Sequence, residues 1–154
     1  MTKVKAPELK VSKWLGTDDN ISLDSLKGQV VLIEAFQLLC PGCVTHAIPQ
    51  AIKARKIFAD HELKVLGLHT VFEHHEAMQE ATLSAFMHEY RINFPVGIDV
   101  ASANTPIPQT MSLYDMRGTP TTLIIDKEGY LRHHLFGAVD DMQLAMHIQS
   151  LISE

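Results

Sequence analysis

The stretch VVLIEAFQLLCPGC, residues 30–43, decides the fold of this chain. Its first seven residues are almost entirely apolar, which predicts a central strand over 29–36 that is buried on both faces of a sheet. Cys40 and Cys43 are the only cysteines in the chain, and a helical pattern over 41–58 follows the strand. A C-x-x-C pair where a buried strand gives way to a helix makes one thiol acidic and supplies its disulfide partner. The stretch therefore predicts redox chemistry at a dithiol.

Length and composition place the chain among soluble globular proteins. Its 154 residues fit a single domain over 1–154, with 46% hydrophobic and 20% charged residues. A net charge of −5 without a basic cluster argues against a nucleic-acid partner. No apolar window is long enough for a membrane span. The first residues carry no secretory signal, which predicts a cytoplasmic location, with a periplasmic or extracytoplasmic one as the alternative if a leader has been removed.

The rest of the chain alternates between strand and helix patterns. This order predicts an α/β protein with a mixed sheet flanked by helices on both faces. We expect the helix over 41–58 to carry Ile48, Ile52, Ile57 and Phe58 inward, and we expect Pro49 to kink it. Further strands are expected at 9–14, 20–23, 63–68, 94–98, 121–126 and 130–136. Helices are expected at 76–90 and 140–150, with a single helical turn at 111–114. Tyr90 is expected on the apolar face of the helix over 76–90.

This pattern resembles the thioredoxin-like superfamily, and within it the TlpA/ResA and redoxin branch. The resemblance rests on the strand–C-x-x-C–helix unit at 30–49, on Glu34 six positions before Cys40, and on the segment 117–126, which is similar to the family's cis-proline loop and following strand. It implies a thioredoxin fold with an N-terminal extension at 1–28 and a helix-containing insertion at 69–110.

Three positions depart from the family pattern. Leu39 stands where thioredoxins have tryptophan, and the residues between the cysteines are Pro-Gly rather than Gly-Pro. Pro49 lies six residues after Cys43, where the family usually has five. The departures concern the surroundings of the dithiol and leave the predicted fold unchanged.

The position of Cys40 at a helix N-terminus predicts that it is the nucleophile. Unpaired N–H groups and the helix dipole stabilise a thiolate there and lower the thiol pKa from about 8.5 to roughly 3.5–7.5. The thiolate would attack a disulfide, and Cys43, one turn further on, would resolve the mixed disulfide. A structural zinc site needs two more ligands and the chain has no second cysteine pair, so we expect no metal.

The resemblance implies roles for further residues. Glu34 would be a buried carboxylate near Cys43 whose raised pKa lets it take the resolving thiol's proton, whereas the plain alternative is an outward-facing strand residue. Thr119 and Pro120 would form a cis peptide opposite the cysteines, with the Thr119 backbone pairing with substrate. Leu39 and Pro41 flank the nucleophile and complete the expected substrate contacts.

The predicted function is that of a thiol:disulfide oxidoreductase without a cofactor, acting as a reductase in the cytosol. Its substrate would be a disulfide-bearing protein or a small thiol compound, and its electron donor stays open between thioredoxin reductase, glutathione and a membrane thiol donor. A thiol peroxidase is one alternative. Gln37 argues against it, because peroxiredoxins have a threonine at this position. A metal-binding module is another, because Sco-type copper chaperones share the fold and His69, His74 or His75 could supply a ligand. The C-x-x-x-C spacing of these chaperones differs from the C-x-x-C of this chain and weighs against a metal-binding module.

Overall fold

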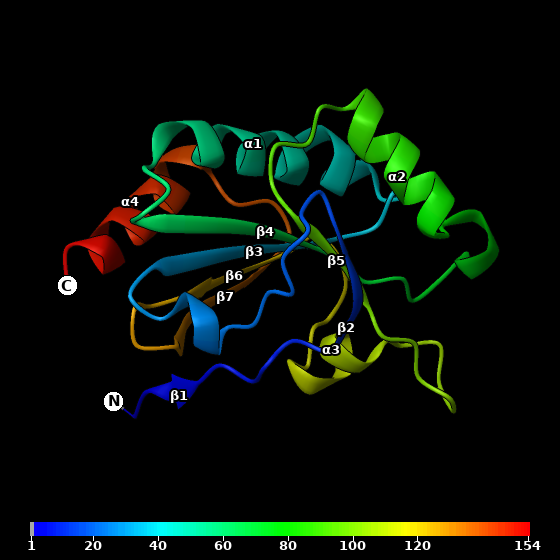
Figure 1. Cartoon of the computed structure of the whole chain (residues 1–154), viewed down its shortest axis with the longest axis horizontal. Coiled ribbons are helices and arrows are strands. Elements are labelled where there is room, and N and C mark those ends of the chain that lie inside the picture. The colour runs from blue at the N-terminus through cyan, green and yellow to red at the C-terminus, as the bar shows by residue number, and fades with distance from the viewer. Residues whose placement is uncertain (1) are drawn as a thin grey trace.

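Seven strands of the computed structural model, which describes residues 2–154, form one mixed sheet in the order β1-β7-β6-β3-β4-β5-β2 (Figure 1). The central strand β3 is parallel to β4 and antiparallel to β6. All seven residues of β3 are buried, which confirms the prediction from the apolar run. The strands are β1 (Val4–Lys5), β2 (Val11–Leu15), β3 (Val30–Phe36), β4 (Leu63–His69), β5 (Val96–Asp99), β6 (Thr121–Ile125) and β7 (Tyr130–Phe136).

Helices cover both faces of this sheet, as Figure 1 shows. The face that carries Leu32 and Phe36 packs under apolar side chains of α1, α2 and α4, whereas the opposite face packs against α3 and the N-terminal segment. The predicted α/β thioredoxin fold is thereby confirmed. The helices are α1 (Ile48–Ile57), α2 (Glu80–Glu89), α3 (Gln109–Leu113) and α4 (Asp141–Ile152), with 3₁₀ turns η1 (Asp24–Leu26) and η3 (His75–Ala77) and a π-helical segment η2 (Cys43–Ala47).

The helix after Cys40 is α-helical at Pro41 and Gly42, continues as the π-helical segment η2 and becomes α-helical again at α1. In η2 the Ile48 N–H donates to the Cys43 carbonyl, five residues back. Pro49 follows directly and has no N–H of its own to donate to a preceding turn. A π-turn is how a helix absorbs one additional residue. The one extra position that separates Pro49 from Cys43, relative to the usual family spacing, is therefore accommodated by a wider turn.

Two strand predictions are corrected by the structure. Residues 20–23 form a loop that leads into η1, because the Glu8 carboxylate accepts the N–H groups of Leu23 at 2.5 Å and Asp24 at 3.3 Å and holds the chain in a turn. The strand expected at 9–14 occupies Val11–Leu15. The two-residue strand β1, which pairs with β7, is too short to leave a periodic signal.

Two apolar side chains that we expected in the core lie at the surface. Ile57 is 71% exposed, because the face that α1 turns toward the sheet carries Ile48, Ala51 and Ala54 and does not include Ile57. Tyr90 is 52% exposed and stacks on Phe86, with ring centroids 4.3 Å apart. The predicted helix over 76–90 is also shorter, since η3 is followed by a break before α2.

Within residues 2–154, no helix combines the length and the apolarity that crossing a membrane requires.

Candidate active site

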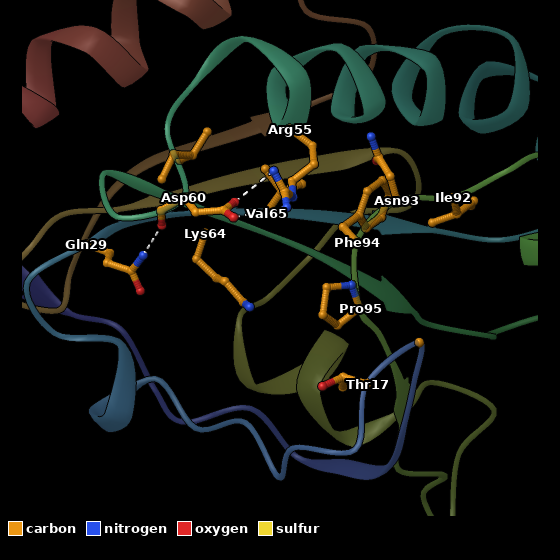
Figure 2. Close-up of a pocket in the computed structure, with 12 residues that line it drawn as sticks. Thr17, Gln29, Arg55, Asp60, Lys64, Val65, Ile92, Asn93, Phe94 and Pro95 are labelled. Carbon is orange, nitrogen blue, oxygen red and sulfur yellow. Dashed lines mark hydrogen bonds and ion pairs between the residues drawn. The ribbon is translucent and has the colours of Figure 1, made fainter.

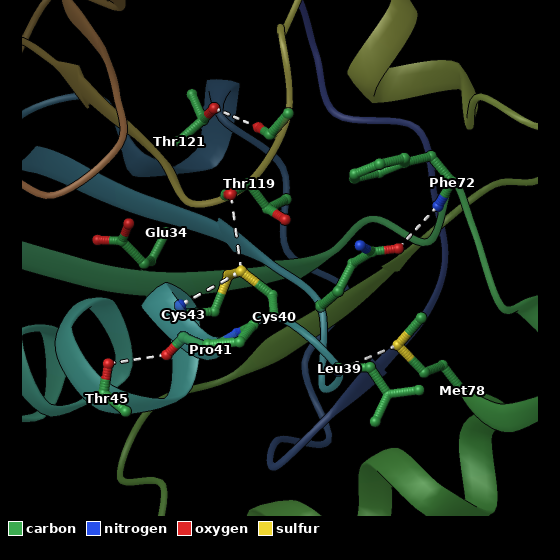
Figure 3. The surroundings of a disulfide bond; sticks show 12 residues. Glu34, Leu39, Cys40, Pro41, Cys43, Thr45, Phe72, Met78, Thr119 and Thr121 are labelled. Carbon is green, nitrogen blue, oxygen red and sulfur yellow. Dashed lines mark hydrogen bonds between the residues drawn. A yellow bond between two sulfur atoms is a disulfide. The ribbon is translucent and has the colours of Figure 1, made fainter.

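The two cysteines form a disulfide at the end of the central strand (Figure 3). Cys40 lies in the loop that leaves β3, and Cys43 is the first residue of η2, with their Cα atoms 5.2 Å apart. Cys43 is fully buried, whereas Cys40 is half-buried. Of the two cysteines, only Cys40 is therefore partly accessible to another molecule.

Polar backbone groups surround the Cys40 sulfur. The N–H of Cys43 donates to Cys40 Sγ at 3.3 Å, and the carbonyl oxygen of Thr119 lies 3.6 Å from the same sulfur. A backbone N–H at this distance stabilises negative charge, so it would hold the thiolate once the disulfide is reduced. The arrangement gives Cys40 the surroundings of a nucleophile.

The loop that carries Thr119 and Pro120 faces the cysteines. The Thr119–Pro120 peptide is cis, and the Cβ of any side chain at Gly42 would lie 3.6 Å from the Pro120 ring. The loop is held at one end by the Thr121 hydroxyl, which donates to the Gly118 carbonyl at 2.7 Å. The edge beside Cys40 therefore has the half-buried Thr119 on one side and the exposed Leu39 and Pro41 on the other, whereas Pro120 is buried behind it.

Leu39 and Pro41 are exposed on either side of the nucleophile. Leu39, which replaces the family's tryptophan, is 55% exposed, and its backbone N–H donates to the Met78 sulfur at 3.4 Å. Met78 is buried and comes from the turn between η3 and α2. It fixes the backbone just before Cys40 from outside the dithiol motif, and Figure 3 shows its sulfur directed toward Leu39.

Glu34 is completely buried within β3, among the residues around the disulfide that Figure 3 draws. Its Oε1 accepts a hydrogen bond from the Thr122 hydroxyl at 2.9 Å, while its Oε2 has no hydrogen-bond partner among residues 2–154. Burial raises the pKa of Glu34 to about 8, against the opposing effect of the Thr122 hydrogen bond. A carboxyl with this pKa is matched to exchange protons with a thiol.

Sequence reasoning assigned no structural role to three residues that hold the site in place: Gln37, Met78 and Thr122. The Gln37 side chain is buried, and its amide oxygen accepts the Phe72 N–H at 3.0 Å. Each of these contacts joins residues at least 35 positions apart in the sequence. The only signal in the sequence was the position of Gln37, a polar residue directly after the apolar run over 30–36. That position does not identify the residue with which Gln37 forms a hydrogen bond.

The histidines proposed as metal ligands do not come together. His69 is buried against the Phe36 ring, and burial lowers its pKa to about 4. His74 and His75 lie at the surface of the following turn. Within the part of the chain that the structure describes, no group of three histidine, cysteine or acidic side chains could hold a metal ion.

A cavity of about 550 Å³ lies at the other end of the sheet (Figure 2). Its walls come from the beginning of β4, the end of α1 and the segment before β5, and they include Lys64 and the Arg55–Asp60 ion pair at 2.7 Å. None of the residues predicted for the redox site lines it. The cavity is therefore separate from the dithiol.

Comparison with known proteins gives the family. A model of the AhpC/TSA family matches residues 2–134. The chain belongs to this family. The chain is also 33% identical over 138 residues to protein DipZ of Mycobacterium tuberculosis and covers only 19% of that protein, so it spans about one fifth of this relative. It is 26% identical over 159 residues to the thiol:disulfide interchange protein DsbE of Allochromatium vinosum, covering 96% of this chain and 74% of that one.

Solved structures confirm the resemblance to thioredoxin-like proteins. A crystal structure of a thioredoxin-like superfamily protein is 52% identical with a TM-score of 0.96, covering 98% of this chain and 97% of the other. A thiol-disulfide isomerase from Corynebacterium glutamicum is 42% identical with a TM-score of 0.93, covering 97% of both chains. The chain is therefore thioredoxin-like, and its relatives include proteins named for thiol:disulfide interchange and for thiol-disulfide isomerisation.

Proposed function

We propose that the chain reduces disulfides through a two-step exchange at Cys40 and Cys43. The Cys40 thiolate attacks one sulfur of the substrate disulfide, and the other sulfur leaves as a thiolate. The Cys43 thiolate then attacks Cys40 Sγ and releases the second substrate thiol. Two electrons pass from the dithiol to the substrate, which leaves Cys40 and Cys43 joined as a disulfide. The observation that carries this proposal is that Cys40 is partly accessible while Cys43 is fully buried.

Glu34 supplies the proton acceptor for the second step in this proposal. The Cys43 thiol must lose its proton before it can attack, and bulk water does not reach a fully buried thiol readily. Glu34 is buried around the same disulfide and has a pKa of about 8, close to that of a thiol. Its unpartnered Oε2 is free to take the proton.

The substrate would contact the edge formed by Leu39, Pro41, Thr119 and Pro120. An extended substrate chain can pair with the backbone at Thr119, while the exposed Leu39 and Pro41 offer apolar contacts on the other side of Cys40. This edge suits a protein disulfide as well as a small one. The donor that returns the dithiol to its reduced form belongs to the classes named above: thioredoxin reductase, glutathione or a membrane thiol donor.

Trapping of the mixed disulfide tests the order of the two steps. A Cys43→Ser variant should accumulate a covalent adduct with a disulfide substrate such as insulin, detected by mass spectrometry, because the resolving thiol is missing. Cys40→Ser should form none. An adduct on Cys43 in the Cys40→Ser variant, or no adduct in either, would overturn the assignment.

The direction of electron flow is tested by the reduction potential of the dithiol, measured by equilibration in glutathione buffers. A value near −270 mV, about that of thioredoxin, supports a reductase, whereas a value near −120 mV, about that of the strongest oxidants of this fold, supports an oxidase. Peroxide consumption with a thiol donor tests the peroxidase alternative. The Gln37 amide oxygen is already bound to the Phe72 N–H, which supports the reductase assignment over a peroxide site there.

We also propose that the chain works outside the cytosol, contrary to the first expectation from its sequence. Its DsbE relatives are named thiol:disulfide interchange proteins. Interchange between protein disulfides requires a compartment where disulfides form and persist, such as the bacterial periplasm. Fractionation of cells that express the natural gene, with immunodetection of this chain, tests the location.

A further inference from the structure

We propose that Thr122 is a positioning residue that sets the proton affinity of Glu34, and with it the pH range in which Cys43 resolves the mixed disulfide. The first half of this inference concerns a hydrogen bond within the sheet. The second half rests on the function proposed above, in which Glu34 accepts the proton of Cys43. The two halves can be tested separately.

The two side chains face each other across a pair of neighbouring strands. Glu34 of β3 and Thr122 of β6 are direct partners in the antiparallel ladder, so both side chains project from the same face of the sheet. Thr122 is 1% exposed and Glu34 is 0% exposed. The Thr122 hydroxyl donates to Oε1 at 2.9 Å, and Oε2 has no partner among the described residues. The carboxyl group thus depends on a single hydrogen bond.

A hydroxyl can serve both protonation states of a carboxyl group, but it does not favour them equally. It donates to the carboxylate, and it can rotate to accept a hydrogen bond from the protonated acid. A hydrogen bond to a charged acceptor is roughly twice as strong as one between neutral groups. Thr122 therefore favours the ionised form of Glu34 and opposes the effect of burial. Without this hydroxyl, both oxygens of a buried carboxylate would lack a donor.

Ionisable groups on the same side of the sheet supply no direct bond to Glu34. Gly67, its partner on β4, has no side chain, and His69 beyond it has a pKa lowered to about 4 by burial, so it is neutral in the working range. The pKa of Glu34 is shifted by burial and by the Thr122 hydrogen bond. The other titratable or charged groups on the helices packed over this face are Cys43 and His46 of η2, Lys53, Arg55 and Lys56 of α1, Glu80, His88 and Glu89 of α2, and Asp141 and His147 of α4. His133 of β7, which stacks on His147, lies on the same face of the sheet.

The neighbouring Thr121 offers a matched control. It is equally buried and lies on the same strand, but it pairs with Ala35 and projects from the opposite face of the sheet. Its hydroxyl donates to the Gly118 carbonyl rather than to Glu34. A threonine-to-valine change at 121 thus removes the same chemical group from the same strand without touching the carboxyl group.

The first test follows the titration of Glu34 by ¹³C NMR of its side-chain carboxyl carbon. The oxidised protein is used, because its cysteines are joined and do not titrate. Thr122→Val should raise the midpoint by up to about one pH unit, since only the difference between the hydrogen bond to the carboxylate and the weaker one to the neutral acid shifts the midpoint. Thr122→Ser should restore the wild-type midpoint, and Thr121→Val should leave it unchanged. If valine does not fit at 122, Thr122→Ala makes the same test. An unchanged midpoint in a folded Thr122→Val or Thr122→Ala protein would overturn the inference.

The second test measures release of the second substrate thiol in a single turnover between pH 6 and 10. The pH dependence in Thr122→Val should move upward by the same amount as the NMR midpoint, which lowers the rate at pH 7 by up to about tenfold. Thr122→Ser should recover the wild-type profile. If Glu34→Gln keeps the wild-type pH dependence, the proposed role of Glu34 fails, while the NMR midpoints still decide whether Thr122 sets its proton affinity.

Discussion

The sulfur of Cys40 lies 3.6 Å from the carbonyl oxygen of Thr119, a residue 79 positions later in the chain. The Cys43 N–H approaches the same sulfur at 3.3 Å. The nucleophile therefore lies between one hydrogen-bond donor and one acceptor, both of which belong to the backbone. Side-chain substitutions elsewhere in the molecule leave these two groups in place as long as the fold holds them.

This geometry predicts selective alkylation of one cysteine in the reduced protein. The Cys43 N–H stabilises a thiolate on Cys40, so iodoacetamide should modify Cys40 with a pH midpoint below about 8.5, the value for a free thiol. Cys43 should stay unmodified because it is fully buried. Peptide mapping by mass spectrometry at a series of pH values checks both expectations. Equal labelling of the two cysteines would contradict them.

Glu34 should make the folded state less stable as the pH rises. Its pKa is 4.5 in the unfolded chain and about 8 in the fold, so between these values the unfolded state binds fewer protons. The free energy of unfolding of the oxidised protein should therefore fall with rising pH, with a contribution of about 1.4 kcal/mol per unit between pH 5 and 8. Urea unfolding of Glu34→Gln should lack this contribution. Glu128→Gln, at an exposed position, should keep this contribution. If the free energy of unfolding of Glu34→Gln changes with pH as steeply as that of wild type, the raised pKa of Glu34 is contradicted.

His69 should have the opposite effect at lower pH. The unfolded chain binds a proton near pH 6.5, whereas burial lowers the folded-state pKa to about 4, so stability is lost as the pH falls through this window. His69→Phe keeps a ring against Phe36 and removes the buried Nε2, which has no hydrogen-bond partner among residues 2–154. The stability of His69→Phe minus that of wild type should therefore be larger at pH 4.5 than at pH 7. His88→Phe, at an exposed position, serves as control in the same thermal unfolding series.

Met78 should matter for the loop before the nucleophile. Met78→Leu preserves the apolar volume but removes the sulfur that accepts the Leu39 N–H, which leaves this donor without its partner. We expect a loss of about 0.5–1.5 kcal/mol in the free energy of unfolding and faster amide exchange at Leu39. Hydrogen exchange followed by NMR measures the second effect. Met146→Leu changes a methionine that is 70% exposed and should alter neither quantity.

The sequence predicted the features that depend on local pattern. The run over 30–36 identified the buried strand, and a carboxylate within that run identified Glu34 as an unusual residue. The partners of Glu34 and Leu39 could not be predicted, because Thr122 and Met78 reach them only through strand register and the packing of a distant turn. Ile57 was misplaced for a related reason, since periodicity does not tell which apolar face of a helix the sheet will cover.

The N-terminal fifteen residues supply both outermost strands of the sheet. β1 pairs with Tyr130 and Leu131 at the start of β7, and β2 pairs along β5, at opposite edges of the sheet. An uncovered edge presents unpaired N–H and C=O groups that recruit strands from other molecules. A chain shortened by these residues would expose two such edges at once and could polymerise in both directions. The N-terminal segment would thus act on self-association through the edges of the sheet, at a distance from the dithiol.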